Sequence, residues 1–183
     1  MLHEIIISGF GGQGALFAGQ LLAYGALDEN RHVTWIPSYG PEMRGGTANC
    51  TVIISDEEIG SPLVRYPSVA IVMNPPSFER FEPVMKKGGV LIANASLVSS
   101  VSKRADIRFI PVQANEIAAE LGGAQMANVV MVGALLQATG ALTLETLDKV
   151  LEEHISARHR AKIPANKQAL RRGAALAQEL ARV

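Results

Sequence analysis

Cysteine is almost absent from the 183-residue chain, which contains only Cys50. A single thiol cannot form an internal disulfide bond. It also cannot supply the set of about four thiolates that holds an iron–sulfur cluster or a cysteine-rich zinc site. The histidines are scattered and show no His-x-x-x-His spacing, so a helical zinc motif is not expected either. Any metal-based redox chemistry that this protein serves is therefore predicted to reside on another chain, and we expect Cys50 to be a small buried apolar residue.

Charged residues are also few, and their signs balance. They make up 19% of the chain, with 17 basic and 17 acidic residues, whereas roughly 25% is typical of soluble domains. A net charge of zero gives no global field that would attract nucleic acid or an anionic membrane, so neither partner is expected. The low charge content favours extensive contact with other subunits, although an alanine-rich and valine-rich domain without partners would have the same composition.

Long apolar runs are missing as well. The longest uninterrupted stretch, residues 129–136, is far shorter than the ~20 residues that a membrane-spanning helix needs. The apolar run at residues 5–7 is too short for the core of a signal peptide. We therefore expect a cytoplasmic protein.

What the chain does contain is an alternation of short β-branched runs with longer helical patterns. Strands are expected at residues 3–8, 33–37, 47–55, 68–73, 90–93 and 107–111, and helices at residues 13–27, 77–86, 115–121, 128–139, 143–154 and 164–181. A turn at residues 56–60 favours an antiparallel excursion. The alternation predicts a single domain over residues 1–183 with a three-layer α/β/α fold, built on a mostly parallel or mixed sheet of the Rossmann-like kind.

Two of the expected helices are apolar on nearly every side. These are the helix at residues 13–27, where Gln20 is the main exception, and the helix at residues 128–139, for which Asn128 is the expected N-terminal cap. A helix that is apolar all round is buried on more than one face. In a chain of this size, we expect the extra face to meet a partner.

A glycine-rich turn joins the first expected strand to the first expected helix. Its pattern, Gly-x-Gly-x-x-Gly, suits a phosphate-binding turn, because glycine lets the backbone approach a phosphate and the helix N-terminus offers free N–H groups. The candidate ligand-binding residues are Gly9, Gly11, Gly12, Gln13 and Gly14. A nicotinamide site would also need an acidic residue at the end of the second strand, but that strand ends at Pro37-Ser38. The alternative role of the glycines is close packing of the helix against the strand.

A second unusual segment follows the second strand, at residues 38–46. Arg44 stands there among glycines, and its planar guanidinium group is suited to binding a phosphate or a carboxylate through two hydrogen bonds. If the strands are parallel, this segment lies at the same edge of the sheet as the glycine turn. The alternative is an ion pair of Arg44 with Glu42 or simple exposure to solvent.

The C-terminal part of the chain is basic. Residues 155–178 include six lysines and arginines and no acidic residue. This segment either docks on an acidic partner surface or on coenzyme phosphates, or it is a solvated helix face. No combination of nucleophile and base stands out anywhere, so no residue is assigned a catalytic role.

Two segments together resemble one protein family. Gly9-Phe10-Gly11-Gly12-Gln13-Gly14 is similar to the start of the gamma subunits of pyruvate, 2-oxoisovalerate and 2-oxoglutarate:ferredoxin oxidoreductases. Ser38-Tyr39-Gly40-Pro41-Glu42-Met43-Arg44-Gly45-Gly46-Thr47-Ala48 is similar to the second signature of the same family. The separation of the two segments and the chain length also match. The stretch at residues 39–43 is more like the 2-oxoglutarate and branched-chain enzymes than the pyruvate enzymes.

The resemblance implies a mechanism carried mostly by partner chains. Alpha-type and beta-type subunits would hold thiamine diphosphate and magnesium and decarboxylate the 2-oxoacid. Iron–sulfur clusters and a ferredoxin-like subunit would carry the electrons, and coenzyme A would take the acyl group. The gamma subunit would aid assembly and contribute to the coenzyme A region. By itself, the chain would be inactive and could form a homodimer.

For this chain the resemblance implies a site at residues 11–14, which would contact a phosphate or another subunit, with Arg44 nearby. Two other interpretations stay open. One is a stand-alone protein that binds nucleotides or coenzyme A. The other is the small subunit of an indolepyruvate oxidoreductase, which is similar around the glycine turn, although residues 39–42 favour the first family.

Overall fold

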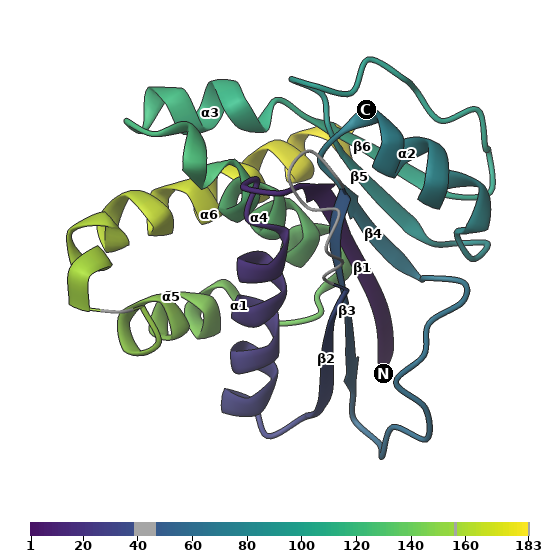
Figure 1. Cartoon of the computed structure of the whole chain (residues 1–183), viewed down its shortest axis with the longest axis horizontal. Coiled ribbons are helices and arrows are strands. Elements are labelled where there is room, and N and C mark those ends of the chain that lie inside the picture. The colour runs from purple at the N-terminus through teal and green to yellow at the C-terminus, as the bar shows by residue number, and fades with distance from the viewer. Residues whose placement is uncertain (39–46, 156, 183) are drawn as a thin grey trace.

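A mixed β-sheet lies at the centre of the structure, a computed structural model that describes residues 1–38, 47–155 and 157–182 (Figure 1). The strand order in this part of the chain is β2-β3-β1-β4-β5-β6. The strands are β1 (Leu2–Phe10), β2 (His32–Ser38), β3 (Thr47–Ser55), β4 (Val69–Val72), β5 (Val90–Asn94) and β6 (Arg108–Val112). Every strand expected from the sequence is present, with ends shifted by at most two residues.

The direction of the strands places the glycine turn and the ends of the segment at residues 39–46 together, at the carboxyl ends of β1 and β2. β1, β4, β5 and β6 are parallel, whereas β3 is antiparallel to both of its neighbours, β1 and β2. The expected antiparallel excursion is therefore confirmed, and β2 runs in the same direction as β1. Phe10 pairs with Thr47 and Ser38 pairs with Asn49. The glycine turn and both flanks of residues 39–46 consequently meet at the carboxyl end of β1.

Helices cover the two faces of the sheet unequally. One face carries α1 (Ala15–Asp28), α4 (Ala127–Thr139), α5 (Leu144–Glu153) and α6 (Ile163–Leu180), as Figure 1 shows, and α3 (Ala114–Glu120) packs on α4. The other face carries α2 (Pro75–Phe81) and the short 3₁₀ turn η1 (Glu82–Val84). Successive residues of β1 follow this division, because Ile5 and Ile7 belong to the larger apolar cluster and Ile6 belongs to the smaller one. The α/β fold is confirmed, and its third layer is thin.

The helix expected at residues 77–86 is shorter and earlier than predicted. The Asn74 side chain accepts a hydrogen bond from the N–H of Ser77 at 2.9 Å and starts α2. The α-helix ends at Phe81, and the chain continues as η1. Pro83 explains the early end, because proline has no N–H to donate to the carbonyl oxygen of the preceding helical turn.

The apolar character of α4 has an internal cause. α4 lies between the sheet and α6, and its residues from Ala127 to Leu136 are all buried. The backbones of α4 and α6 are in direct contact at Gly133 and Gly173, where no side chain would fit. A Cβ atom added to Gly133 would lie 1.9 Å from the Leu170 carbonyl oxygen, and one added to Gly173 would lie 1.9 Å from the Val130 carbonyl oxygen. The expectation that a partner covers this helix was wrong, because α6 of the same chain fills its outer face.

The outer face of α1, by contrast, stays open. Phe17, Tyr24 and Leu27 lie on one stripe of the helix, and Leu27 is 56% exposed. The Tyr24 ring stacks on the His154 imidazole with 4.0 Å between ring centroids. That this stripe meets a partner therefore remains a prediction.

The basic residues of α6 pair with acidic residues of neighbouring helices. Lys167 contacts Glu152 at 2.5 Å and Arg172 contacts Glu120 at 2.8 Å, while Arg171 pairs with Asp148. Exposed pairs of this kind contribute at most about 1 kcal/mol each, so they balance charge more than they stabilise the fold. These contacts favour the interpretation of α6 as a solvated helix face. Within the described residues, no helix combines the length and the apolar character needed to cross a membrane.

We predict that Gly133→Ala destabilises the chain by about 3 kcal/mol or more, because the added methyl group would overlap the Leu170 carbonyl and force two backbones apart. Urea denaturation of the full chain measures the effect. Gly60→Ala is the matched control, since a Cβ atom at Gly60 meets nothing within 4 Å. Equal stability of the two variants would contradict the proposed backbone contact.

Candidate functional site

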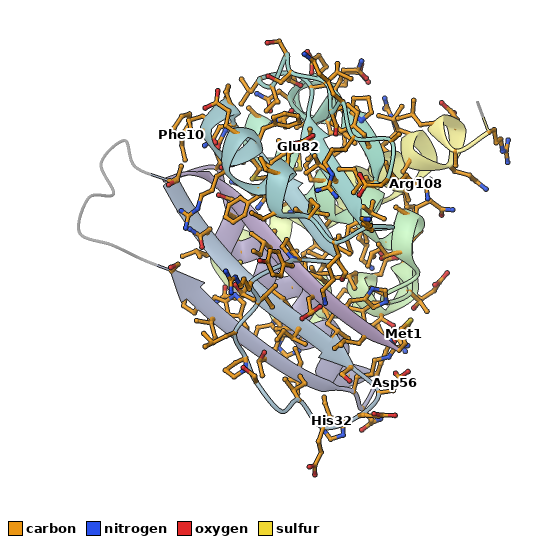
Figure 2. The ribbon with its side chains drawn as sticks, turned by 90° about the vertical axis from the view of Figure 1, so that its right-hand side faces the viewer. Met1, Phe10, His32, Asp56, Glu82 and Arg108 are labelled. Carbon is orange, nitrogen blue, oxygen red and sulfur yellow. The ribbon has the colours of Figure 1, made fainter. Side chains whose placement is uncertain are left out.

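The glycine turn lies just beyond the carboxyl end of β1, between the last strand residue, Phe10, and the first helical residue, Ala15. Figure 2 shows Phe10 at the opposite end of the sheet from Met1, His32 and Asp56. β1 is also where the chain connections diverge, since α1 leads toward β2 on one side and β4 lies on the other. In open α/β sheets, ligands bind in the crevice at such a switch point.

Two of the predicted glycines adopt left-handed backbone conformations that favour glycine. Gly12 has a φ of 94° and Gly14 a φ of 79°, and other residues adopt such left-handed conformations at a cost of roughly 1–2 kcal/mol. Gly9 is needed for a different reason, because a Cβ atom there would lie 2.7 Å from the Oε1 atom of Gln13 and 3.0 Å from the Cβ atom of Met73. Close packing therefore accounts for Gly9, and turn geometry accounts for Gly12 and Gly14.

Gln13 closes the turn and ties it to the next strand. Its Oε1 atom accepts a hydrogen bond from the Phe10 N–H at 2.6 Å, and its Nε2 atom donates to the Met73 carbonyl oxygen at 3.2 Å. Its own N–H donates to the Phe10 carbonyl at 3.1 Å. Both ends of the side-chain amide are thus used inside the protein, so Gln13 shapes the turn.

Asn128 holds the far end of the turn, and it does not cap α4 as the sequence predicted. The 3₁₀ turn η2 (Ala124–Met126) runs directly into α4, so that Met126 occupies the capping position. The Asn128 Nδ2 atom donates to the Gly14 carbonyl oxygen at 3.0 Å. Sequence reasoning missed this role, because the only available signal was one polar residue at the start of an apolar helix.

Several backbone N–H groups of the turn have no acceptor among the described residues. Within the described part of the chain, the N–H groups of Gly11, Gly12 and Gly14 donate to no backbone or side-chain acceptor. The first turn of α1 adds N–H groups that have no partner inside the helix. Free N–H groups at a helix N-terminus favour an anionic ligand such as a phosphate.

Two pockets open beside the turn, and Gly12 lines both. The first, called here the turn pocket, measures about 400 Å³ and is bounded by Phe10, Gly14, Leu16 and Ala48. The second, called here the amide pocket, measures about 270 Å³ and lies beyond β4 and β5. Its polar lining consists of the side-chain amides of Gln13, Asn94, Asn115 and Gln125.

Among the described residues, neither pocket has a lysine or an arginine in its lining. The turn therefore offers hydrogen-bond donors and partial charge without a full positive charge. Arg44, the predicted source of such a charge, lies outside the described residues with the rest of residues 39–46. Ser38 and Thr47, which flank residues 39–46, lie at the carboxyl ends of β1 and β2.

Cys50 lies behind the turn and is not a candidate nucleophile. Its side chain is fully buried, and its Sγ atom donates to the Ala15 carbonyl oxygen at 3.4 Å. Burial raises the pKa of the Cys50 thiol to about 11, so almost none of it is the reactive thiolate near neutral pH. The expectation of a small buried residue is confirmed.

One group of described residues could offer three ligand atoms to a metal ion. Asp28, Glu153 and His154 lie at the ends of α1 and α5, and all three are exposed. They stand about 20 Å from Gly14, as the rise of α1 dictates. The group is therefore separate from the glycine turn and takes no part in the candidate site.

The sequence of this chain matches one protein family over nearly its whole length. The family described as pyruvate ferredoxin/flavodoxin oxidoreductase matches residues 4–176. The chain belongs to this family. The match includes the glycine turn, nearly all of the sheet and most of α6, and it confirms the resemblance found in the two sequence motifs.

The match to this chain covers a different share of each relative's length. The chain is 43% identical over 146 residues to ketoisovalerate oxidoreductase subunit VorA of Methanothermobacter marburgensis, a match that covers 80% of the chain and 30% of VorA. It is 34% identical over 158 residues to 2-oxoglutarate synthase subunit KorC of Methanocaldococcus jannaschii, covering 85% and 84% of the two chains. The chain thus spans less than a third of the first relative and most of the second.

The fold has a solved counterpart. The crystal structure of the gamma subunit of keto/oxoacid ferredoxin oxidoreductase from Geobacter sulfurreducens aligns with a TM-score of 0.86 at 26% identity, and the match covers 98% of both chains. The α/β architecture expected for a gamma domain is thereby confirmed.

We predict different costs for alanine at the two left-handed glycines of the turn. Gly12→Ala meets no neighbouring atom and should cost only the roughly 1–2 kcal/mol of a left-handed residue. Gly14→Ala adds a Cβ atom 2.3 Å from the Asn128 Nδ2 atom and should cost about 1–3 kcal/mol more through overpacking. Urea denaturation of both variants tests the order, and a Gly12→Ala variant that is the less stable would contradict it.

Proposed function

We propose that this chain is the gamma subunit of a coenzyme A-dependent 2-oxoacid:ferredoxin oxidoreductase complex, in which it aids assembly and contributes to the coenzyme A region. The family match over residues 4–176 carries this proposal. The near absence of cysteine supports the same division of labour, because the chain cannot hold an iron–sulfur cluster by itself. Thiamine diphosphate, magnesium and the clusters belong to alpha-type, beta-type and ferredoxin-like partners in this proposal.

Coenzyme A is a suitable ligand for the glycine turn. Its phosphates are the kind of anion that free N–H groups at a helix N-terminus bind, and Gly11, Gly12 and Gly14 offer such groups. The turn pocket, at about 400 Å³, lies toward the small end of the range of ligand pockets. It would therefore hold one end of coenzyme A, while a partner subunit holds the rest.

The described residues of this chain give no basis for choosing the 2-oxoacid. The relatives are named for three different acids, which are ketoisovalerate, 2-oxoglutarate and pyruvate. The pockets beside the turn are lined by backbone, apolar groups and neutral amides, whereas selection of a dicarboxylate would call for a further cation. We therefore place acid selectivity on the thiamine-bearing partners.

The proposal predicts that a tagged full chain, purified from its native host, brings down larger chains in a fixed ratio together with the visible absorbance of iron–sulfur clusters. The complex should reduce ferredoxin when supplied with a 2-oxoacid and coenzyme A. A chain that elutes alone and binds coenzyme A directly would instead support the stand-alone binding protein and overturn the subunit assignment.

A second prediction concerns Arg44. Arg44→Ala should raise the KM for coenzyme A of the purified complex roughly tenfold or weaken assembly, because one charge-assisted contact to a phosphate is lost. The urea denaturation midpoint of the isolated chain should stay unchanged. Arg108→Ala is the control, since Arg108 is the first residue of β6, the outermost strand on the side of the sheet away from β2. Wild-type assembly and coenzyme A kinetics in Arg44→Ala would remove Arg44 from the site.

A further inference from the structure

Asn128 is the one polar residue among the first ten of α4, and it is buried, with 3% of its surface exposed. A side-chain amide in such surroundings is costly unless its hydrogen bonds are made. Both ends of this amide are used, because Oδ1 accepts from the Val129 N–H at 2.9 Å and Nδ2 donates to the Gly14 carbonyl at 3.0 Å. The first bond fixes which end of the amide faces the turn.

We infer that Asn128 is a positioning residue for the glycine turn, which sets the direction of the free N–H groups and through them the affinity for coenzyme A. This inference rests on the proposed function. Asn128 itself need not touch the ligand. It acts through the peptide group that joins Gly14 to Ala15.

The geometry of that peptide group transmits the effect. In a trans peptide the carbonyl oxygen and the following N–H point in opposite directions from one plane. The Gly14 carbonyl oxygen is held by Asn128 and by the Ala18 N–H, each at 3.0 Å. The Ala15 N–H is therefore fixed on the side away from Asn128, and both Gly14 and Ala15 line the turn pocket.

Asn128 also explains why residue 14 is glycine. Left-handed backbone alone does not demand glycine in this protein, since Asn30 adopts a φ of 55° within the described chain. A Cβ atom on Gly14, however, would lie 2.3 Å from the Asn128 Nδ2 atom and 3.0 Å from its Cγ atom. The hydrogen bond and the steric contact therefore couple the two positions, because a side chain at residue 14 would displace the Asn128 side chain.

The decisive variant is Asn128→Asp, which keeps the shape of the side chain and removes the donor. A carboxylate oxygen would face the Gly14 carbonyl oxygen, so the peptide should rotate or move. Asn166→Ala is the matched control. Asn166 is likewise a buried asparagine whose Nδ2 atom donates to a backbone carbonyl, that of Lys162 at 2.9 Å, but it does not contact the turn.

Kinetics of the purified complex separate positioning from simple stability. We expect Asn128→Asp to raise the KM for coenzyme A roughly tenfold, with the KM for the 2-oxoacid, the subunit ratio and kcat at saturating coenzyme A all unchanged. Asn166→Ala should leave every one of these values at the wild-type level. A wild-type KM for coenzyme A in Asn128→Asp would overturn the inference, and so would an equal rise in Asn166→Ala.

Nuclear magnetic resonance of the isolated full chain tests the position of the turn without the other subunits of the complex. Asn128→Asp should shift the amide resonances of Gly14 and Ala15, whereas Asn166→Ala should leave them in place. Unshifted resonances would overturn the positioning role. If this shift occurs but the wild-type chain neither joins a complex nor responds to coenzyme A, the positioning geometry stands and the proposed function fails.

Discussion

The backbone contact between α4 and α6 is the constraint on which the rest of the structure depends. Gly133 and Gly173 let the two helices touch without side chains between them, and α4 can then lie fully buried against the sheet. Its N-terminal end comes to rest beside the turn after β1, where Asn128 reaches the Gly14 carbonyl.

The candidate site is built from backbone groups that are held by two amide side chains. Gln13 fixes the start of the turn and Asn128 fixes its end. The N–H groups between them have no acceptor within the described part of the chain. Fixed dipoles of this kind need no rearrangement when an anion binds, which is the general advantage of a preorganised site. We propose a phosphate as the ligand of this site, whose described residues supply no nucleophile, acid or base.

The relatives fit the idea of a domain that completes a larger assembly. The same domain makes up 30% of VorA and most of KorC, so it occurs both within a long chain and as a small separate one. The exposed apolar stripe of α1, with Phe17, Tyr24 and Leu27, is where we predict contact with another subunit. α4 gives no such indication, because α6 covers it.

The sequence was enough to predict the strands, the α/β class, the turn at residues 9–14 and the family, because β-branched runs, helical periodicity and glycine spacing are local patterns. It did not determine the end of α2 at Phe81 or the roles of Asn128 and of the apolar face of α4. These features depend on contacts between segments that are far apart in the sequence. α6 begins more than twenty residues after α4 ends, and Asn128 lies 114 positions after Gly14. Only the packing of α4 between the sheet and α6 decided that a polar side chain predicted to cap one helix would instead hold the turn that begins another.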